Sequence, residues 1–404
     1  MSESLRRSEQ REHGIATGGL IDPDAPRSEA GFPRAPFIPG PNWFRVESML
    51  SRNVLTSGTG EVRYFESSAL RGNFLNDPSQ RPMVVYLPAS YDREPRKSYP
   101  VVYVLHGAMT DVGSWLHREM GRSSLLERMD QICGQSKVEA ILVLIDGWTS
   151  VGGSQYLNSP AVGRYHDYFV DDVTGFVDAN FRTVASAAGR AVLGHSSGGF
   201  GAWNACVSQP DVFAYLAMLA PDCLFEGVFL HTLAPAIRRL REQYEGSMEV
   251  FWASRRDDSG EVVAQSAERI QQSQDTHGGP WNPLDTAIFD QHMLAAAFAH
   301  PSDDAAQYLF LGDGRINASV WARWLEHDPV RSAHRFATAL RELQFIGLSA
   351  GSEDEFFADN GAASLAGELG KLGVGYHLSI GSGNHEPGEN FDDLFRTLIT
   401  AINV

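Results

Sequence analysis

Lysine and cysteine are scarce in this chain, and long apolar runs are missing from it. Only three lysines, Lys97, Lys137 and Lys371, occur among the 33 lysine and arginine residues, so a Schiff-base lysine has few candidates. The three cysteines have no CxxC spacing, which argues against a disulfide framework and against a zinc knuckle. No stretch of about 18 apolar residues occurs, so we expect no membrane-spanning helix.

Positive charge is also in short supply. The formal net charge is -17 at pH 7, and no run of lysine and arginine offers a local exception. Such a chain repels phosphate backbones and anionic lipid surfaces, so neither nucleic acid nor a membrane is an expected partner. The N-terminus has no apolar signal segment, which predicts a cytoplasmic location. Without an HExxH motif or a clustered His/Cys set, we expect no metal and no cofactor.

The composition that remains is that of a globular enzyme-sized protein. The 404 residues are 43% hydrophobic and 10% aromatic, which is ample material for a core. Residues 1–40 are polar and rich in glycine, proline and charge, and this composition predicts a flexible arm. From residue 41 onward apolar runs alternate with helical patterns, without a clear linker and without an internal repeat.

Short, β-branched apolar runs indicate strands that are buried on both faces, and helix-like stretches lie between them. This alternation predicts an α/β fold with a mostly parallel sheet and helices on both faces. The expected strands are Met83–Leu87, Val101–Leu105, Ala140–Ile145, Ala191–Gly194, Tyr215–Ala220, Phe345–Ser349 and Tyr376–Ile380, and the expected helices include Ser124–Cys133, Asp171–Phe181, Gly199–Ser208, Ala362–Leu372 and Phe391–Ile402.

Residues 223–344 break this rhythm. They carry four of the eight tryptophans on mainly helical or irregular sequence, and the interval is too long for an ordinary connection between strand and helix. Because functional loops gather at the carboxyl edge of such a sheet, we expect a largely helical cap over the site, inserted between core segments at 41–222 and 345–404. The alternative is an insertion that packs on the flank of the core.

Ser196 lies at the centre of the segment Gly194–Gly198, which reads GHSSG. An apolar strand precedes it and a helical pattern follows it, as in the nucleophile elbow, where flanking glycines let strand and helix approach closely. A serine hydroxyl needs a base, an acid that orients the base, and donors for the oxyanion. A helix N-cap would also explain a serine here, but it leaves Gly194 unexplained.

The acid and then the base are expected after the nucleophile along the chain. His385 lies in a loop directly after the last expected strand, where it can present its imidazole at the sheet edge; an ordinary surface histidine is the alternative. Asp354 follows the preceding strand and is our first choice for the acid. Glu353 is the second choice, and a solvated acidic turn is the remaining interpretation.

The amides of Ser197 and Ala108 are the expected oxyanion donors, with Met109 as the alternative to Ala108. Gly107 permits the turn that aims the next amide inward. His106 could be read as a base, but its position before the nucleophile favours an architectural role.

Four side chains are candidates for contact with the substrate: Met109, Trp148, Tyr165 and Tyr168. The tyrosines and Trp148 follow the end of the third expected strand, although packing in an amphipathic layer explains them equally well. The acidic, tryptophan-rich chain fits a neutral or aromatic ester better than a polyanion.

Six segments give the sequence a recognisable likeness. It resembles the putative esterase family of α/β-hydrolases, the group related to esterase D, feruloyl esterases, enterochelin esterases and mycolyltransferases. The resemblance implies an α/β-hydrolase fold with a triad of Ser196, Asp354 and His385. The segments that carry it are RPMVVYLPASYD (81–92), YPVVYVLHG (99–107), GRYHDYFVDDVTGFVDANFRT (163–183), GHSSGGFGAW (194–203), GSEDEF (351–356) and GNHEP (383–387).

These features together predict a serine esterase that hydrolyses a carboxylic ester of a small molecule through an acyl-enzyme on Ser196. Two other functions stay open. One is an acyltransferase that uses the same triad, and the other is a catalytically inactive binding protein with the same fold. The sequence is compatible with a homo-oligomer.

Overall fold

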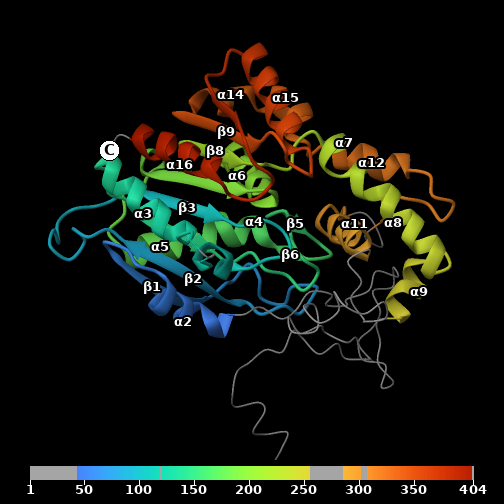
Figure 1. Cartoon of the computed structure of the whole chain (residues 1–404), viewed down its shortest axis with the longest axis horizontal. Helices are drawn as coiled ribbons and strands as arrows, with labels where there is room; N and C mark the ends of the chain where they lie inside the picture. Colours follow the sequence, from blue (N-terminus) through green and yellow to red (C-terminus); the bar gives the residue numbers. More distant parts are fainter. Residues whose placement is uncertain (1–42, 119–120, 255–284, 302–306, 403–404) are drawn as a thin grey trace, which may run out of the picture.

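The computed structural model describes residues 43–118, 121–254, 285–301 and 307–402. Its centre is an eight-stranded sheet with the order β1-β2-β4-β3-β7-β8-β9-β10 (Figure 1). All neighbours from β4 to β10 are parallel, and β2 runs antiparallel to both of its neighbours. The strands are β1 (Thr59–Glu66), β2 (Gln80–Leu87), β3 (Val101–Leu105), β4 (Ile141–Ile145), β7 (Arg190–His195), β8 (Tyr215–Leu219), β9 (Phe345–Gly351) and β10 (His377–Gly381), and β5 (Asn158–Ser159) pairs with β6 (Gly163–Arg164).

All seven expected strands are present, with ends that shift by up to three residues. Strands β3, β4 and β8 are buried at every position, which requires cover on both faces of the sheet. The expectation of burial on both faces is wrong for β10, because this strand lies at the edge of the sheet, and Ile380 within it is 40% exposed. Strand β1 lies at the opposite edge of the sheet. The sequence does not predict it, because its polar and apolar residues are mixed and form no apolar run.

Some helices pack against the sheet, and others lie at one of its ends. Helix α16 contacts α3 and strands β8 to β10, whereas α6 contacts β3, β7 and β8. The helices are α2 (Trp43–Asn53), α3 (Leu125–Ser136), α4 (Tyr165–Asp167), α5 (Thr174–Asn180), α6 (Ser197–Ser208), α7 (Phe225–Val228), α8 (Leu230–Gln243), α9 (Met248–Ala253), α11 (Thr286–Ala297), α12 (Ala318–Leu325), α13 (Pro329–Ser332), α14 (Ala337–Glu342), α15 (Ala358–Lys371) and α16 (Glu389–Ala401).

Two helix starts illustrate how the sequence sets these elements. Ser124 caps α3 in a capping box, in which its hydroxyl accepts from the amide of Glu127 while the Glu127 carboxylate accepts from the amide of Ser124. The helix expected over 171–181 is instead divided, because a π-helical segment, Tyr168–Val173, precedes α5.

The interval 223–344 contributes to two places. Helices α7, α8, α9, α11 and α12 lie together at one end of the sheet (Figure 1, right), whereas α13 contacts α15 and α14 contacts α6 of the core. Residues 255–284 and 302–306 lie outside the described residues, as does the arm expected at 1–40. The boundaries of the cap therefore stay a prediction.

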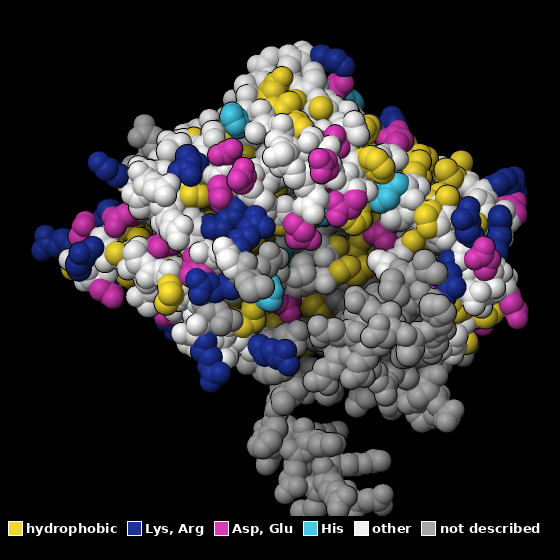
Figure 2. All heavy atoms as spheres, in the orientation of Figure 1, with side chains coloured by type: hydrophobic (Ala, Val, Ile, Leu, Met, Phe, Trp, Pro, Cys, Tyr) yellow, Lys and Arg dark blue, Asp and Glu magenta, His cyan; other side chains and the backbone are white. Residues whose placement is uncertain are grey.

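The surface carries charge of both signs. On the face that Figure 2 shows, acidic and basic side chains of the described residues are interspersed, and hydrophobic side chains gather on the side where α7, α8 and α12 lie. In the ranges that the structure describes, no helix is long and apolar enough to cross a lipid bilayer.

Candidate active site

Ser196 lies on a strained turn between β7 and α6, with φ 56° and ψ −123°. Such a conformation is rare outside glycine and costs roughly 1–3 kcal/mol. The flanking glycines make it attainable. A Cβ on Gly194 would lie 1.9 Å from the carbonyl oxygen of Gly198, and a Cβ on Gly198 would lie 2.3 Å from that of Leu105. The expected strand, sharp turn and helix are therefore present around this serine.

His385 and Asp354 meet at the carboxyl edge of the sheet. Nδ1 of His385 donates to Oδ2 of Asp354 at 2.8 Å, and both side chains are buried. The other carboxylate oxygen of Asp354 accepts from the amides of Phe356 and Ala358. Glu353, the alternative acid, is exposed. The structure thus brings Asp354 to the histidine.

The electrostatics of this pair favour its charged form. Burial alone would raise the pKa of Asp354, but the hydrogen bond and charge of His385, together with the two amides, hold this pKa below its usual value. Burial would likewise lower the pKa of His385, yet the hydrogen bond and charge of Asp354 raise it above its usual value. An imidazolium formed at His385 is therefore stabilised.

Two residues that the sequence interpretation did not assign hold the His385 loop. Nε2 of His195 donates to the carbonyl oxygen of His385 at 2.9 Å, and the Glu355 carboxylate accepts from the His385 amide at 3.0 Å. Burial, with a smaller effect of His385, lowers the pKa of His195 to about 3, so His195 stays neutral. Both residues lie in segments that carry the family resemblance, His195 in 194–203 and Glu355 in 351–356, and this position was the only indication of a role.

The loop after β3 lies directly against the serine. A Cβ on Gly107 would lie 3.2 Å from the Cβ of Ser196, so a larger residue would crowd the nucleophile. His106 has an architectural role here, because its Nδ1 donates to the carbonyl oxygen of Gly107 and its Nε2 accepts from the amide of Gly147 at 2.8 Å. These bonds join the ends of β3 and β4.

The amides near Ser196 differ in their availability. The Met109 amide donates to the carbonyl oxygen of Gly152 at 2.6 Å, which removes it as the alternative oxyanion donor. Within the described residues, no acceptor pairs with the amides of Ala108 or Ser197. These two amides are the ones left to meet a ligand oxygen.

A cavity of 710 Å³ opens over these groups. Its lining includes Ser196, His385 and the loop after β3, and it includes Met109, as expected. The interval 223–344 forms another wall through Val228, Phe229, Thr232, Pro235, Thr286, Ala287, Asp290 and Met293. Three carboxylates line the cavity, and no lysine or arginine of the part of the chain that the structure describes does so. Among the described residues, no group of three His, Cys, Asp or Glu side chains could hold a metal ion.

The sequence profile of the family described as putative esterase matches residues 78–371, well over half of the chain. The chain belongs to the putative esterase family. An endo-1,4-beta-xylanase/feruloyl esterase of Xylanibacter ruminicola is 27% identical over 140 residues, which are 34% of this chain and 19% of that protein. An esterase of Mycobacterium tuberculosis is 34% identical over 122 residues, which are 29% of this chain and 24% of that protein.

This family member therefore spans less than two thirds of the length of those relatives. Its fold matches the solved structure of a ferulic acid esterase with a TM-score of 0.50 and 18% identity, over 86% of this chain and 98% of that one. Together with the mostly parallel sheet, this match shows the α/β-hydrolase fold.

Asp222 is a site residue of this esterase-family chain that the sequence interpretation missed. It follows the end of β8 and lines the cavity, and its Oδ1 lies 3.5 Å from the Ser196 hydroxyl, which donates to it. Gln155 donates to its other oxygen at 3.0 Å. Its position after a strand indicates a site residue, because residues that follow the carboxyl ends of parallel strands meet at one edge of the sheet. This rule applies to Asp222 after β8 as it does to Asp354 after β9.

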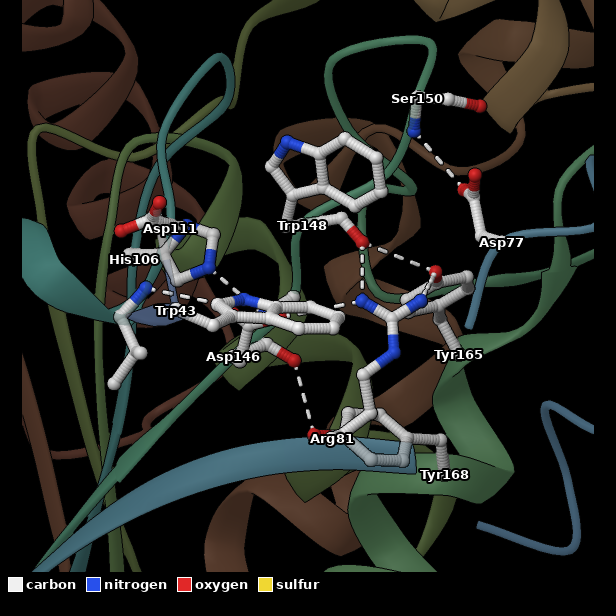
Figure 3. A network of polar contacts seen from close by, with 12 residues as sticks. Trp43, Asp77, Arg81, His106, Asp111, Asp146, Trp148, Ser150, Tyr165 and Tyr168 are labelled. Atoms are coloured by element: carbon white, nitrogen blue, oxygen red, sulfur yellow. Dashed lines mark hydrogen bonds and ion pairs between the residues drawn. The ribbon is translucent and has the colours of Figure 1, made fainter. Parts of the chain in front are cut away.

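The expectation that Trp148, Tyr165 and Tyr168 contact the substrate is wrong. All three are buried outside the cavity, around a buried ion pair between Arg81 and Asp146 (Figure 3). Arg81 donates to the Tyr165 hydroxyl at 2.6 Å and to the Trp148 carbonyl oxygen at 2.7 Å. The Tyr168 hydroxyl donates to the carbonyl oxygen of Asp146. The aromatic residues near the strand end serve packing and hydrogen bonding.

This network is connected to the loop after β3, which lies against Ser196. Asp146 directly follows β4 and also accepts from the indole of Trp43, which ties α2 to the sheet (Figure 3). The segment that follows it supplies Gly147 and Gly152, the partners of the loop after β3. Removal of the ion pair is therefore expected to disturb the position of the loop after β3 as well.

Replacing Arg81 by methionine should lower the free energy of unfolding by roughly 3–5 kcal/mol, because it leaves the Asp146 carboxylate buried without its partner. Arg63→Met is the matched control. Arg63 pairs with Glu61 at 2.8 Å but is half exposed, so its loss should cost about 1 kcal/mol or less. Urea unfolding followed by tryptophan fluorescence measures both. Equal effects of the two substitutions would contradict the structural role of Arg81.

Proposed function

We propose that this putative esterase family member hydrolyses carboxylic esters of small molecules through an acyl-enzyme on Ser196. The observation that carries the proposal is the meeting of three features at one cavity: a serine on a strained turn, a buried Asp354–His385 pair, and two amides for which the described chain supplies no acceptor. Each feature supplies one requirement of serine catalysis.

In the first step, the Ser196 oxygen attacks the ester carbonyl carbon while Nε2 of His385 takes the hydroxyl proton. Asp354 fixes the tautomer that leaves Nε2 unprotonated and stabilises the imidazolium that forms. The amides of Ala108 and Ser197 donate to the oxyanion, each contributing roughly 3 kcal/mol. His385 then returns the proton to the alcohol oxygen as the C–O bond breaks.

In the second step, water takes the place of the alcohol. His385 accepts a proton from the water as its oxygen attacks the acyl carbon, and then gives that proton to the Ser196 oxygen as the acid leaves. Product analysis with and without an added alcohol separates hydrolysis from acyl transfer, because only a transferase would form the new ester in preference to the acid.

The cavity supports a neutral acyl or alcohol group. Of the eight residues that line it from the interval 223–344, five are apolar, and Asp222, Asp290 and Glu386 place negative charge around the space. Apolar lining with few polar groups is typical of sites for drug-sized ligands. The names of a relative and of a solved structure suggest feruloyl esters as one neutral, aromatic class of substrate to assay.

An ester with a carboxylate on its acyl chain should be a poor substrate. We expect p-nitrophenyl hemisuccinate to have a kcat/KM at least about tenfold below that of p-nitrophenyl 4-methylpentanoate, its isosteric neutral partner, because like charges within several ångströms repel by more than 1 kcal/mol in a site of this kind. Initial rates, corrected for uncatalysed hydrolysis, give the ratio. In Asp290→Asn the ratio should fall toward one, and a preference for the anion would contradict this reading of the cavity.

A fluorophosphonate probe with peptide mapping tests the function itself. The probe should modify the peptide that contains Ser196 and abolish turnover of p-nitrophenyl esters and of methyl ferulate in parallel. Modification of another serine, or turnover that survives complete labelling, would refute the proposed nucleophile.

A further inference from the structure

Asp222 contacts the reacting oxygen of the proposed nucleophile, and the catalytic steps above leave it without a role. Its Oδ1 accepts from the Ser196 hydroxyl, and its backbone amide donates to the carbonyl oxygen of the same serine at 3.3 Å. We propose that Asp222 is a further catalytic residue, whose carboxylate holds the Ser196 hydroxyl in place until its proton turns to Nε2 of His385, and then stabilises the His385 imidazolium that attack creates. This inference rests on the proposed function of Ser196 and His385.

The backbone around Asp222 is held in a demanding conformation. Ala220 and Leu224, two residues to either side, have φ values of 41° and 55°. A non-glycine residue in this region costs roughly 1–2 kcal/mol. The Asp328 carboxylate fixes the turn from outside by accepting from the amides of Leu224 and Phe225. Such strain persists only where the surroundings impose it, and it gathers at functional sites.

The carboxylate of Asp222 has no cationic side chain as an ion-pair partner among the described residues, although it is buried. Four groups face it from four segments: the Ser196 hydroxyl, the Gln155 amide, the His385 imidazole and the Asp290 carboxylate. Burial raises the pKa of Asp222 to about 6, the Gln155 hydrogen bond and the charge of His385 oppose this rise, and the charge of Asp290 adds to it. The carboxylate is therefore mainly ionised at neutral pH.

His385 responds to this second carboxylate. Asp222 and Glu355 add to the dominant effect of Asp354 in raising the pKa of His385, and His195 remains neutral beside it. When Ser196 attacks, the proton moves from its oxygen to Nε2 of His385, and the positive charge on the ring interacts with both Asp354 and Asp222. The proton leaves again with the alcohol, and Asp222 keeps its charge throughout.

The test follows the rate of fluorophosphonate acylation of Ser196 against pH, alongside kcat/KM for a p-nitrophenyl ester. In Asp222→Asn, both rates should fall at least about tenfold on the plateau, since the charge that stabilises the imidazolium is lost. Their acid limb should move to lower pH, because a group that raises the pKa of His385 has been removed. No group in the described ranges pairs with the side-chain oxygen of Gln155, so it can accept from the new amide and preserve the packing.

Gln155→Leu provides a second variant with the opposite sign. It removes the donor that lowers the pKa of Asp222, so Asp222 should become protonated at higher pH and the acid limb should move upward. Glu353→Gln is the control for charge near the site and should leave the plateau within about threefold, because Glu353 is exposed and does not line the cavity. If Asp222→Asn does not fold, as judged by circular dichroism, the shift in Gln155→Leu decides.

Two results would overturn the role of Asp222. One is a plateau in Asp222→Asn within twofold of the wild type, and the other is an unmoved acid limb despite a lower plateau, which a merely structural role produces. Failure of the proposed function looks different, because the wild-type protein would then neither react with the probe at Ser196 nor hydrolyse esters at any pH.

Discussion

Replacing Ser196 by alanine is expected to lower kcat for any ester substrate by at least ~10⁴-fold and to abolish fluorophosphonate labelling. Removal of a nucleophilic serine leaves only oxyanion binding and substrate binding to accelerate the reaction, and precedent sets the loss at about that size or above. The substitution deletes one oxygen atom, and alanine tolerates the turn at φ 56° about as well as serine does. Single-turnover kinetics with a p-nitrophenyl ester measure the loss.

Ser197→Ala is the matched control for this prediction. Ser197 is a serine too, and a buried one, but the role proposed for it belongs to its backbone amide, which the substitution keeps. Its kcat should stay within about fivefold of the wild type. Thermal unfolding of both variants verifies that the fold is intact. If Ser197→Ala loses turnover and Ser196→Ala keeps it, the nucleophile has been assigned to the wrong hydroxyl.

The arrangement of Ser196, Asp354 and His385 could be predicted because each follows the end of a parallel strand. The apolar runs of β7, β9 and β10 are readable in the sequence, and parallel strands bring their carboxyl ends to one edge of the sheet. The glycines around Ser196 added a steric reason that the close backbone approach at Gly194 confirms. The order of the three residues along the chain and their positions after strand ends were therefore sufficient to predict the site.

Asp222 could not be singled out from the sequence, because a serine triad requires only one acid and Asp354 already meets that requirement. The sequence interpretation places Asp222 at the end of the core segment 41–222 and gives it no role, although Asp222 follows a strand end just as Asp354 does. Its contact with Ser196 depends on the left-handed conformations at Ala220 and Leu224, which no sequence pattern announces in residues other than glycine. Tertiary contacts, such as those from Asp328, decide such a turn.

The prediction of substrate contacts at the tyrosines was wrong for a related reason. Tyr165 and Tyr168 were expected in the cavity because aromatic residues near a strand end often line pockets, but the sequence does not reveal where a buried charge needs hydrogen bonds. Arg81 lies in the interior, and burial of its guanidinium is tolerable only with Asp146 and surrounding oxygens as partners. The aromatic hydroxyls meet that demand, which is a property of the folded chain alone.

Replacing Asp354 by asparagine is expected to lower kcat by ~10³–10⁴-fold. An asparagine can offer its amide protons to Nδ1 of His385, which favours the tautomer with the proton on Nε2, and that nitrogen can then no longer accept the Ser196 proton. The pKa of His385 should also fall, since its main stabilising charge is gone. A pH profile of kcat/KM measures both effects.

Glu353→Gln is the control that makes this prediction discriminating. It removes the same charge from the adjacent residue, with an equally isosteric change, but Glu353 is exposed and Asp354 is the partner of His385 at 2.8 Å. Turnover should remain within about threefold of the wild type, because an exposed carboxylate is screened by water and salt. A large loss in Glu353→Gln with activity kept in Asp354→Asn would transfer the role of the acid to Glu353. Losses of similar size in both would mean that the local charge of the loop, rather than one hydrogen bond, sets the tautomer of His385.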